Sequence, residues 1–252
     1  KEKNNIIIKG DGINKTKFIF DYPDNYSSNG FLIQLSHRIG IEDISVTRKE
    51  NDITWALEEL LEIDISKPVV PQNNHHIAIS HSDNCWVMGV FFGKTYKSHI
   101  TISFSNNITI KNNYFGGAHF VRSGEGYGVH IFGYPSSPCT SNRIEDNIFD
   151  GLRHSVVLQC ETFYNVISYN YCVGGRWLEN ERNPAASNTP IDIIFHGREL
   201  NNTLSDLGPR VNLVEGNNAE RIAMDHSHDN NGPYNTFFRN TARAKCGLQF
   251  ND

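Results

Sequence analysis

The sequence has few of the features that mark membrane-spanning, nucleic-acid-binding or disulfide-rich proteins. No apolar run among its 252 residues is long enough to cross a bilayer, so we expect no transmembrane segment. The net charge of −5 gives no electrostatic reason to expect nucleic acid as a partner. The 5 cysteines are an odd number without a CxxC pair, which argues against a zinc site and a full disulfide framework.

Both ends of the sequence interrupt a pattern. No signal peptide precedes Lys1, and the chain opens almost directly on a strand-like run at 5–10. The last residues, 247–252, stop within a repeat. We therefore expect residues 1–252 to form a single domain and to be a segment of a longer protein, secreted or displayed at the cell surface.

A short phrase of the form apolar-x-x-Asn-x-apolar recurs along the chain. The copies lie at 41–46, 87–92, 110–115, 144–149, 167–172, 214–219 and 237–242, and the first two lack the Asn. Successive copies begin 46, 23, 34, 23, 47 and 23 residues apart, which indicates a unit of 23, doubled twice and once enlarged by 11. Such a period, with short β-branched runs, predicts a β-solenoid whose turns stack on one another.

The repeated Asn has a physical role in that arrangement. Asn tolerates the left-handed backbone that a corner between two strands needs. When turns stack at strand spacing, equivalent Asn side chains can also bond to one another along the stack. We therefore expect an asparagine ladder at one corner of the solenoid.

Four stretches resemble a known superfamily. These are NNIIIKGDGINKTKFIF at 4–20, NNITIKNNYF at 106–115, SNRIEDNIF at 141–149 and YNVISYNY at 164–171. They are similar to turns of the pectate-lyase-like superfamily, which has the pectin-lyase fold. The resemblance implies an all-β, right-handed parallel β-helix and a carbohydrate-active protein. It also implies the activity of a lyase or a uronate epimerase. The superfamily's lyases and epimerases use Arg, Lys or His in catalysis, often with calcium.

One stretch departs from the strand pattern. Trp55, Leu57, Leu60 and Leu61 have helical spacing among glutamates, and Pro68 follows. We expect a short amphipathic helical insertion near residues 52–63.

A second strand in each turn carries most of the candidate site. If Ile100, Ile102 and their equivalents point inward, alternation places a polar row outward. That row comprises His99, His130, Ser155, Gln159, Asp192, His196 and Asp225, with Arg153 at outward parity and His154 at inward parity. Five of the 11 histidines lie on or beside this strand, at positions 99, 130, 154, 196 and 226.

This row suits β-elimination in an acidic polysaccharide. The reaction needs a group that neutralises the uronate carboxylate, a base and a proton donor for the leaving oxygen. Arg153 is suited to the carboxylate, His130 or His154 to the base, and Tyr127 to the donor. His196 completes the candidate catalytic set, and the candidate substrate-binding residues are His99, Gln159, Arg176, Trp177, Asp192, Asp225 and His226.

Two other functions are consistent with the sequence. A glycoside hydrolase needs two carboxylates, for which Asp192, Asp225 and Asp229 are candidates. A non-catalytic carbohydrate-binding module or adhesin would also use a β-solenoid. No cofactor is required by the residues, although Asp225, Asp229 and Glu125 are candidate calcium ligands. His226 and His228 are candidate zinc ligands, or part of a polar loop.

Overall fold

The computed structural model describes residues 2–21, 29–49, 74–119, 121, 124–176, 191–197, 208–225, 231–244 and 248–250. These residues form three long parallel sheets, named sheets A, B and C, and contain no helix. The helix predicted near residues 52–63 lies outside the described residues. No helix in the described part of the chain is long and apolar enough to span a membrane.

Each sheet contains 8 strands, stacked in the order of the sequence. Sheet A comprises β1 (Asn4–Lys9), β4 (His37–Glu42), β7 (Trp86–Met88), β10 (Thr109–Lys111), β14 (Arg143–Glu145), β18 (Val166–Ser168), β21 (Leu213–Glu215) and β24 (Thr236–Phe238). Sheet B comprises β2 (Lys17–Phe20), β5 (Ser45–Arg48), β8 (Phe91–Phe92), β11 (Tyr114–Gly116), β15 (Ile148–Asp150), β19 (Tyr171–Val173), β22 (Asn218–Ala219) and β25 (Thr241–Ala242).

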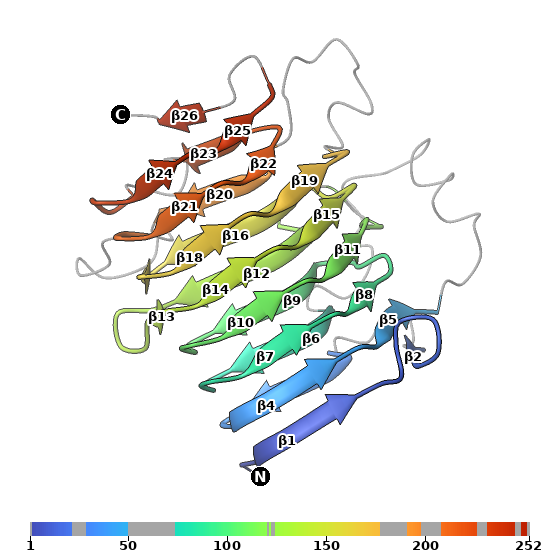
Figure 1. Ribbon diagram of the computed structural model, residues 1–252. Helices are drawn as coiled ribbons and strands as arrows, with labels where there is room; N and C mark the ends of the chain where they lie inside the picture. Colours follow the sequence, from blue (N-terminus) through green and yellow to red (C-terminus); the bar gives the residue numbers. More distant parts are fainter. Residues whose placement is uncertain are drawn as a thin grey trace, which may run out of the picture.

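Sheet C comprises β3 (Phe31–Gln34), β6 (His75–Ser80), β9 (Ser98–Ser103), β12 (Tyr127–Gly133), β16 (His154–Cys160), β20 (Ile193–His196), β23 (Ile222–Asp225) and β26 (Leu248–Phe250). A short pair, β13 (Cys139–Thr140) and β17 (Thr162–Phe163), adds a small fourth sheet. The chain passes through sheets C, A and B in turn, and we call each such coil a rung. Figure 1 shows the rungs stacked from β1 to the C-terminal strands. This is the predicted parallel β-helix.

The 23-residue repeat places equivalent residues in register on adjacent rungs. Ile110 of β10 pairs with Val87 of β7 and with Ile144 of β14, and all three are the first residue of the repeated phrase. Phe115 pairs with Phe92 and Phe149 in the same way. The longer spacings therefore enlarge the turns without shifting the strands.

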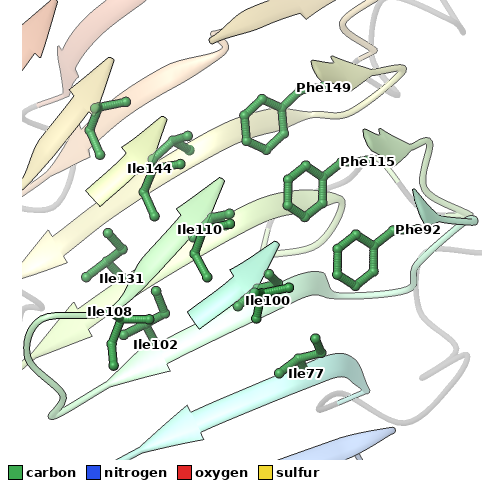
Figure 2. Packing of buried hydrophobic residues seen from close by; sticks show 14 of the residues in the cluster. Ile77, Phe92, Ile100, Ile102, Ile108, Ile110, Phe115, Ile131, Ile144 and Phe149 are labelled. Carbon is green, nitrogen blue, oxygen red and sulfur yellow. The ribbon is translucent and has the colours of Figure 1, made fainter. Parts of the chain in front are cut away.

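A single apolar core runs along the axis inside the three sheets. Its residues come from rows of identical or similar side chains, because equivalent positions stack at strand spacing. The rings of Phe92, Phe115 and Phe149 stack with centroids 4.8 and 4.6 Å apart and planes within 6° of parallel (Figure 2). Isoleucines from sheets A and C fill the space beside them (Figure 2).

Buried asparagines form two hydrogen-bonded columns along the stack. Between sheets A and B, Asn113 Nδ2 donates to Asn147 Oδ1 at 3.0 Å, and Asn147 Nδ2 donates to Asn170 Oδ1 at 3.0 Å. This column continues through Asn217 and Asn240. Between sheets C and A, a second column comprises Asn142, Asn165, Asn212 and Asn235. Each column holds neighbouring rungs in one register.

The left-handed backbone at the corner between sheets A and B lies one residue before the column. Asn112, Asp146 and Tyr169 have φ values of 56°, 56° and 55°. The predicted use of the repeated Asn for the left-handed position is therefore wrong. The column Asn bonds between rungs, while its predecessor makes the bend.

Two histidines are packed within the core beside the phenylalanine stack. His99 is fully buried, and its Nδ1 lies 3.1 Å from Nδ1 of His76. Its Nε2 lies 3.0 Å from the carbonyl oxygen of Gly117, to which it donates. Burial lowers the pKa of His76 to about 3 and holds the pKa of His99 well below its usual range. Both rings are therefore neutral near pH 7.

We predict that Asn147→Leu lowers the free energy of unfolding by at least about 2 kcal/mol, because it leaves buried partners on two rungs unsatisfied. Asn147 Oδ1 accepts from the backbone N and the Nδ2 of Asn113, and its Nδ2 donates to the Ile110 carbonyl. Thermal and urea denaturation measure the change. The exposed, left-handed Asn107 provides the control, since Asn107→Gly should leave stability nearly unchanged. Equal stability of wild type and Asn147→Leu would contradict the role of the column.

We also predict that acid destabilises the fold from about pH 6.5 downward. The unfolded chain binds protons at His76 and His99 below the ordinary histidine pKa, whereas the folded chain does not bind them until a much lower pH. Each histidine then removes up to about 1.4 kcal/mol of unfolding free energy per pH unit. Urea titrations between pH 7.5 and 4.5 measure the slope. The exposed His81 supplies the control for removal of a histidine, as His81→Gln. A flat profile would show that these rings are not neutral in the fold.

Candidate active site

The candidate site lies on the outer face of sheet C. At the start of the strands of this sheet, the alternation of inward and outward side chains is broken. In β12, Val129 and Ile131 lie in the core, so His130 between them faces outward. Regular alternation would also place Gly128 outward. A Cβ on Gly128 would instead lie 2.6 Å from the ring of Phe149, so this position faces the core.

The residue before the break faces outward. Tyr127 packs outside the main core, against Val157 and Ile194 of the next two rungs. It pairs in register with Ser98 and His154, which begin the neighbouring strands. The first residue of each of these strands therefore shares the outer face with His130 and its equivalents.

This break corrects several predicted orientations. His99, Ser155 and Asp192 were expected outward, but all three are buried and face inward. The ring of His99 lies 5.5 Å from that of Phe115, which is part of the core. His154 was expected inward, and its ring instead lies 5.4 Å from that of Tyr127. The sequence pattern assumed strict alternation from the first strand residue, which the corner does not follow.

Asp192 is a structural carboxyl group inside the helix. Ser155 Oγ donates to its Oδ1 at 3.2 Å, and the backbone N of Glu220 donates to its Oδ2 at 2.6 Å. Burial raises the pKa of Asp192 to about 6. Asp192 therefore does not share the outer face with His130.

The outward side chains of sheet C and its preceding turns form a connected cluster. Arg153 Nη1 donates to Tyr127 Oη at 2.9 Å, and the Tyr127 ring packs on that of His154. The His154 ring meets the ring of His196 at 6.0 Å, nearly edge to face. His196 Nδ1 lies 3.2 Å from Asp225 Oδ2. The structure thus brings together five of the predicted site residues from four rungs.

His130 and Gln159 extend the cluster. His130 Nε2 lies 2.9 Å from Gln159 Oε1, and its ring meets Tyr127 edge to face with centroids 5.4 Å apart. Burial lowers the pKa of His130 to about 4, so the imidazole is neutral near pH 7. With Nε2–H donating to Gln159, the lone pair lies on Nδ1.

His154 is also neutral, and its tautomer follows from its backbone contact. Its Nδ1 lies 2.5 Å from the carbonyl oxygen of Ile191, an acceptor, so Nδ1 carries the proton. Burial, followed by the charge of Arg153, holds the pKa of His154 well below its usual range. The lone pair is therefore on Nε2.

Exposure divides the cluster into two layers. Tyr127, Arg153, His154 and His196 are buried, at 7%, 6%, 0% and 6% relative exposure. His130, Gln159 and Asp225 are half-buried. A ligand on this face of the described structure therefore meets His130, Gln159 and Asp225 first.

Two neighbours of His130 escaped the sequence analysis. Burial lowers the pKa of His75 to about 3, and the charge of Lys97 contributes. Lys97 also lowers the pKa of His130, to a smaller extent than burial does. Lys97 directly precedes β9 just as Arg153 directly precedes β16, and this shared place before the strand was the available signal.

Of the other predicted substrate-binding residues, one lies at the edge of this cluster and two lie outside the described residues. Arg176 follows β19, and its side chain lies beside Gly151 on the turn before Arg153. Trp177 and His226 lie outside the described residues, as do His228 and Asp229.

The predicted calcium and zinc ligands are only partly among the described residues, because His226, His228 and Asp229 lie outside them. Among the described residues, no group of three or more His, Cys, Asp or Glu side chains is placed to hold a metal ion. Of the predicted calcium ligands, Asp225 contacts His196, and Glu125 lies in the turn before β12. No step proposed below uses a metal.

Comparisons with known proteins bear on the fold. No protein-family model matches the chain, and no curated protein sequence matches it. Among solved structures, the chain is similar to an alginate lyase from Paenibacillus sp. str. FPU-7, with a TM-score of 0.63 and 10% sequence identity. The match covers 100% of this chain and 85% of that one. The parallel β-helix of this protein is therefore a fold that a polysaccharide lyase also has.

Proposed function

We propose that the protein is a polysaccharide lyase that cleaves an acidic polysaccharide by β-elimination on the outer face of sheet C. The observation that carries the proposal is that neutral histidines contact the Tyr127–Arg153 pair on the outer face of sheet C. The likeness of the fold to an alginate lyase supports the same reaction class.

His130 is the proposed base. It is neutral near pH 7, half-buried on the outer face and oriented by Gln159. Its low pKa in the free protein makes it a weak base. A bound uronate places a negative charge beside it, and a nearby opposite charge raises the pKa of an imidazole. Binding of substrate therefore strengthens the base that acts on it.

Tyr127 is the proposed proton donor. Its oxygen accepts a hydrogen bond from Arg153, which leaves its own proton directed elsewhere. In the reaction, His130 takes the proton from the carbon next to the carboxylate. The electron pair forms a carbon–carbon double bond as the glycosidic C–O bond breaks, and Tyr127 protonates the departing oxygen.

Neutralising the uronate carboxylate falls to Lys97 in this proposal. Arg153 was predicted for that task, but its Nη1 donates to Tyr127. Lys97 is half-buried, and its carbonyl oxygen accepts a hydrogen bond from the backbone N of Tyr127 at 2.9 Å. Its charge contributes to the lowered pKa of His75 and of His130. A cation at this place stabilises the charge that develops on the carboxylate during proton removal. Arg153 then acts by orienting Tyr127.

The geometry disfavours the hydrolase alternative built on Asp192 and Asp225. Hydrolysis needs both carboxylates beside the bond that breaks. Asp192 lies inside the β-helix and Asp225 lies on its outer face next to His196. An epimerase would use the same proton abstraction and return a proton to the same carbon without breaking the chain. Because polysaccharide substrates of this kind lie outside cells, we keep secretion or surface display as part of the proposal.

The test is a screen of wild type against alginate, pectate, glycosaminoglycan and neutral polysaccharides. We predict new ultraviolet absorbance from unsaturated uronate, together with new reducing ends, on at least one acidic substrate. His130→Ala and Arg153→Ala should each lower turnover by at least about 100-fold, because each removes a group that acts on proton transfer. Circular dichroism checks that each variant retains its β-sheet.

His37 supplies the matched control for loss of a histidine. It lies on sheet A, and His37→Ala should retain activity. Full activity of His130→Ala would remove that residue from the mechanism. Reducing ends without ultraviolet absorbance would identify a hydrolase, and binding without either signal would identify a recognition module.

A further inference from the structure

An aromatic cluster lies beside His130 on the outer edge of sheet C, and none of the proposed chemistry uses it. Phe132 is the next outward residue of β12, and its ring lies 6.2 Å from that of His130. The Tyr134 ring meets Phe132 edge to face at 4.7 Å and stacks on Phe104 at 5.6 Å. The His81 ring lies 4.8 Å from that of Phe104.

These rings are large and mostly apolar, yet part of each is accessible to solvent. Phe104, Phe132 and Tyr134 are half-buried, and His81 is exposed. Apolar surface left open next to a polar site commonly marks a place where a ligand packs. The apolar carbons of a ring also provide a broad contact for the C–H groups of a sugar.

Turns that follow the strands of sheet C hold these rings at one edge of the sheet. His81 and Phe104 follow β6 and β9, at left-handed turn positions with φ values of 48° and 54°. Tyr134 is held by a tight turn in which its backbone N donates to the Ser137 carbonyl at 3.2 Å, and Ser137 N donates back at 2.9 Å. This turn folds the Tyr134 ring over Phe104 of the preceding rung.

The outer face of sheet C beside the rings carries small side chains, so a polysaccharide chain can lie against it. His130 pairs in register with Thr101 of β9, and Thr101 with Ala78 of β6. Phe132 pairs likewise with Ser103, which pairs with Ser80. The outer face of sheet C therefore carries small side chains on the two rungs that precede His130.

We propose that this aromatic cluster, defined as His81, Phe104, Phe132 and Tyr134, is a sugar-binding subsite for the polysaccharide that reacts at His130. The proposal rests on the proposed function and adds the direction in which the bound polysaccharide runs across sheet C. The rings span three rungs, about 10 Å along the axis, and are continuous with His130. The bound chain extends from His130 toward β6, with Lys97 near its reacting uronate and the rings against its neighbouring sugars.

The test measures binding of alginate oligosaccharides by calorimetry in a His130→Ala background, so that the ligand is not consumed. Phe104→Asn removes a ring while keeping a residue that tolerates the left-handed backbone. Tyr134→Ala removes the ring that stacks on it. Each substitution should raise the Kd at least about tenfold, the size expected from losing one aromatic stacking contact.

The matched control is Tyr234→Asn. Tyr234 occupies the same kind of left-handed turn, with φ of 63° and 81% exposure, but belongs to a rung near the C-terminal end. Its replacement should leave the Kd within about twofold of the background. Melting temperatures of the three variants show whether a change in binding reflects a loss of fold.

The outcomes separate this inference from the proposed function. Unchanged affinity in Phe104→Asn and Tyr134→Ala, with cleavage by wild type intact, overturns the subsite and leaves the lyase. Weakened binding in both, with no cleavage by wild type on any substrate, supports the subsite and overturns the lyase. Equal weakening by Tyr234→Asn would overturn the subsite, because the loss would then not depend on the position of the ring. Absence of alginate binding, with cleavage of alginate by wild type, would likewise overturn the subsite and leave the lyase.

Discussion

The hydrogen bonds between stacked asparagines are the constraint on which the rest of the structure depends. A parallel stack of short strands has few other means of fixing its register, because many strands of sheets A and B contain only two or three residues. Each column Asn, apart from the last of each column, bonds to the rung before and the rung after. Loss of such a bond in the core would leave buried polar atoms without a partner. The columns therefore determine which residues become neighbours on sheet C.

That register has a direct chemical consequence. Residues separated by 23 or more positions, such as Tyr127, His154 and His196, become neighbours because their rungs stack. The surroundings then keep the histidines neutral, since burial costs a charged imidazole more than a neutral one. Tyr127 and Arg153 are held against this cluster by the turn that opens each strand of sheet C. The site thus depends on the regular stack for neighbours and on the irregular corner for orientation.

The sequence analysis predicted the repeated strands correctly and assigned wrong orientations to residues at the irregular corner before sheet C. Seven copies of one phrase located the strands of sheets A and B, and the β-helix and the outward placement of His130 follow from period and alternation. The orientations of His99, His154 and Asp192 were wrong because one extra bend at the corner reverses the faces of the first strand residues. A signal was present in Gly128, the small residue opposite the large Phe149. Its meaning depends on a contact between rungs that sequence spacing does not contain.

The roles of the cationic residues changed for a related reason. Arg153 is of the residue type that pairs with a carboxylate, yet in the structure its Nη1 donates to Tyr127, the proton donor that we propose. Lys97 had no motif of its own, and its significance arises from its place before β9, near two histidines that lie on other strands. Residue type suggested the chemistry that we propose for this face, and the stacking of the rungs is the basis for the role that we propose for each residue.

The most direct measurement of the central claim is the mass of the products formed from an acidic polysaccharide in water enriched in heavy oxygen. Elimination consumes no water, so the account predicts unsaturated fragments, each lighter by one water than a hydrolysis product, with no heavy oxygen from bond cleavage. Saturated fragments that carry heavy oxygen at the new reducing end would contradict the account and assign hydrolysis to this face of the β-helix.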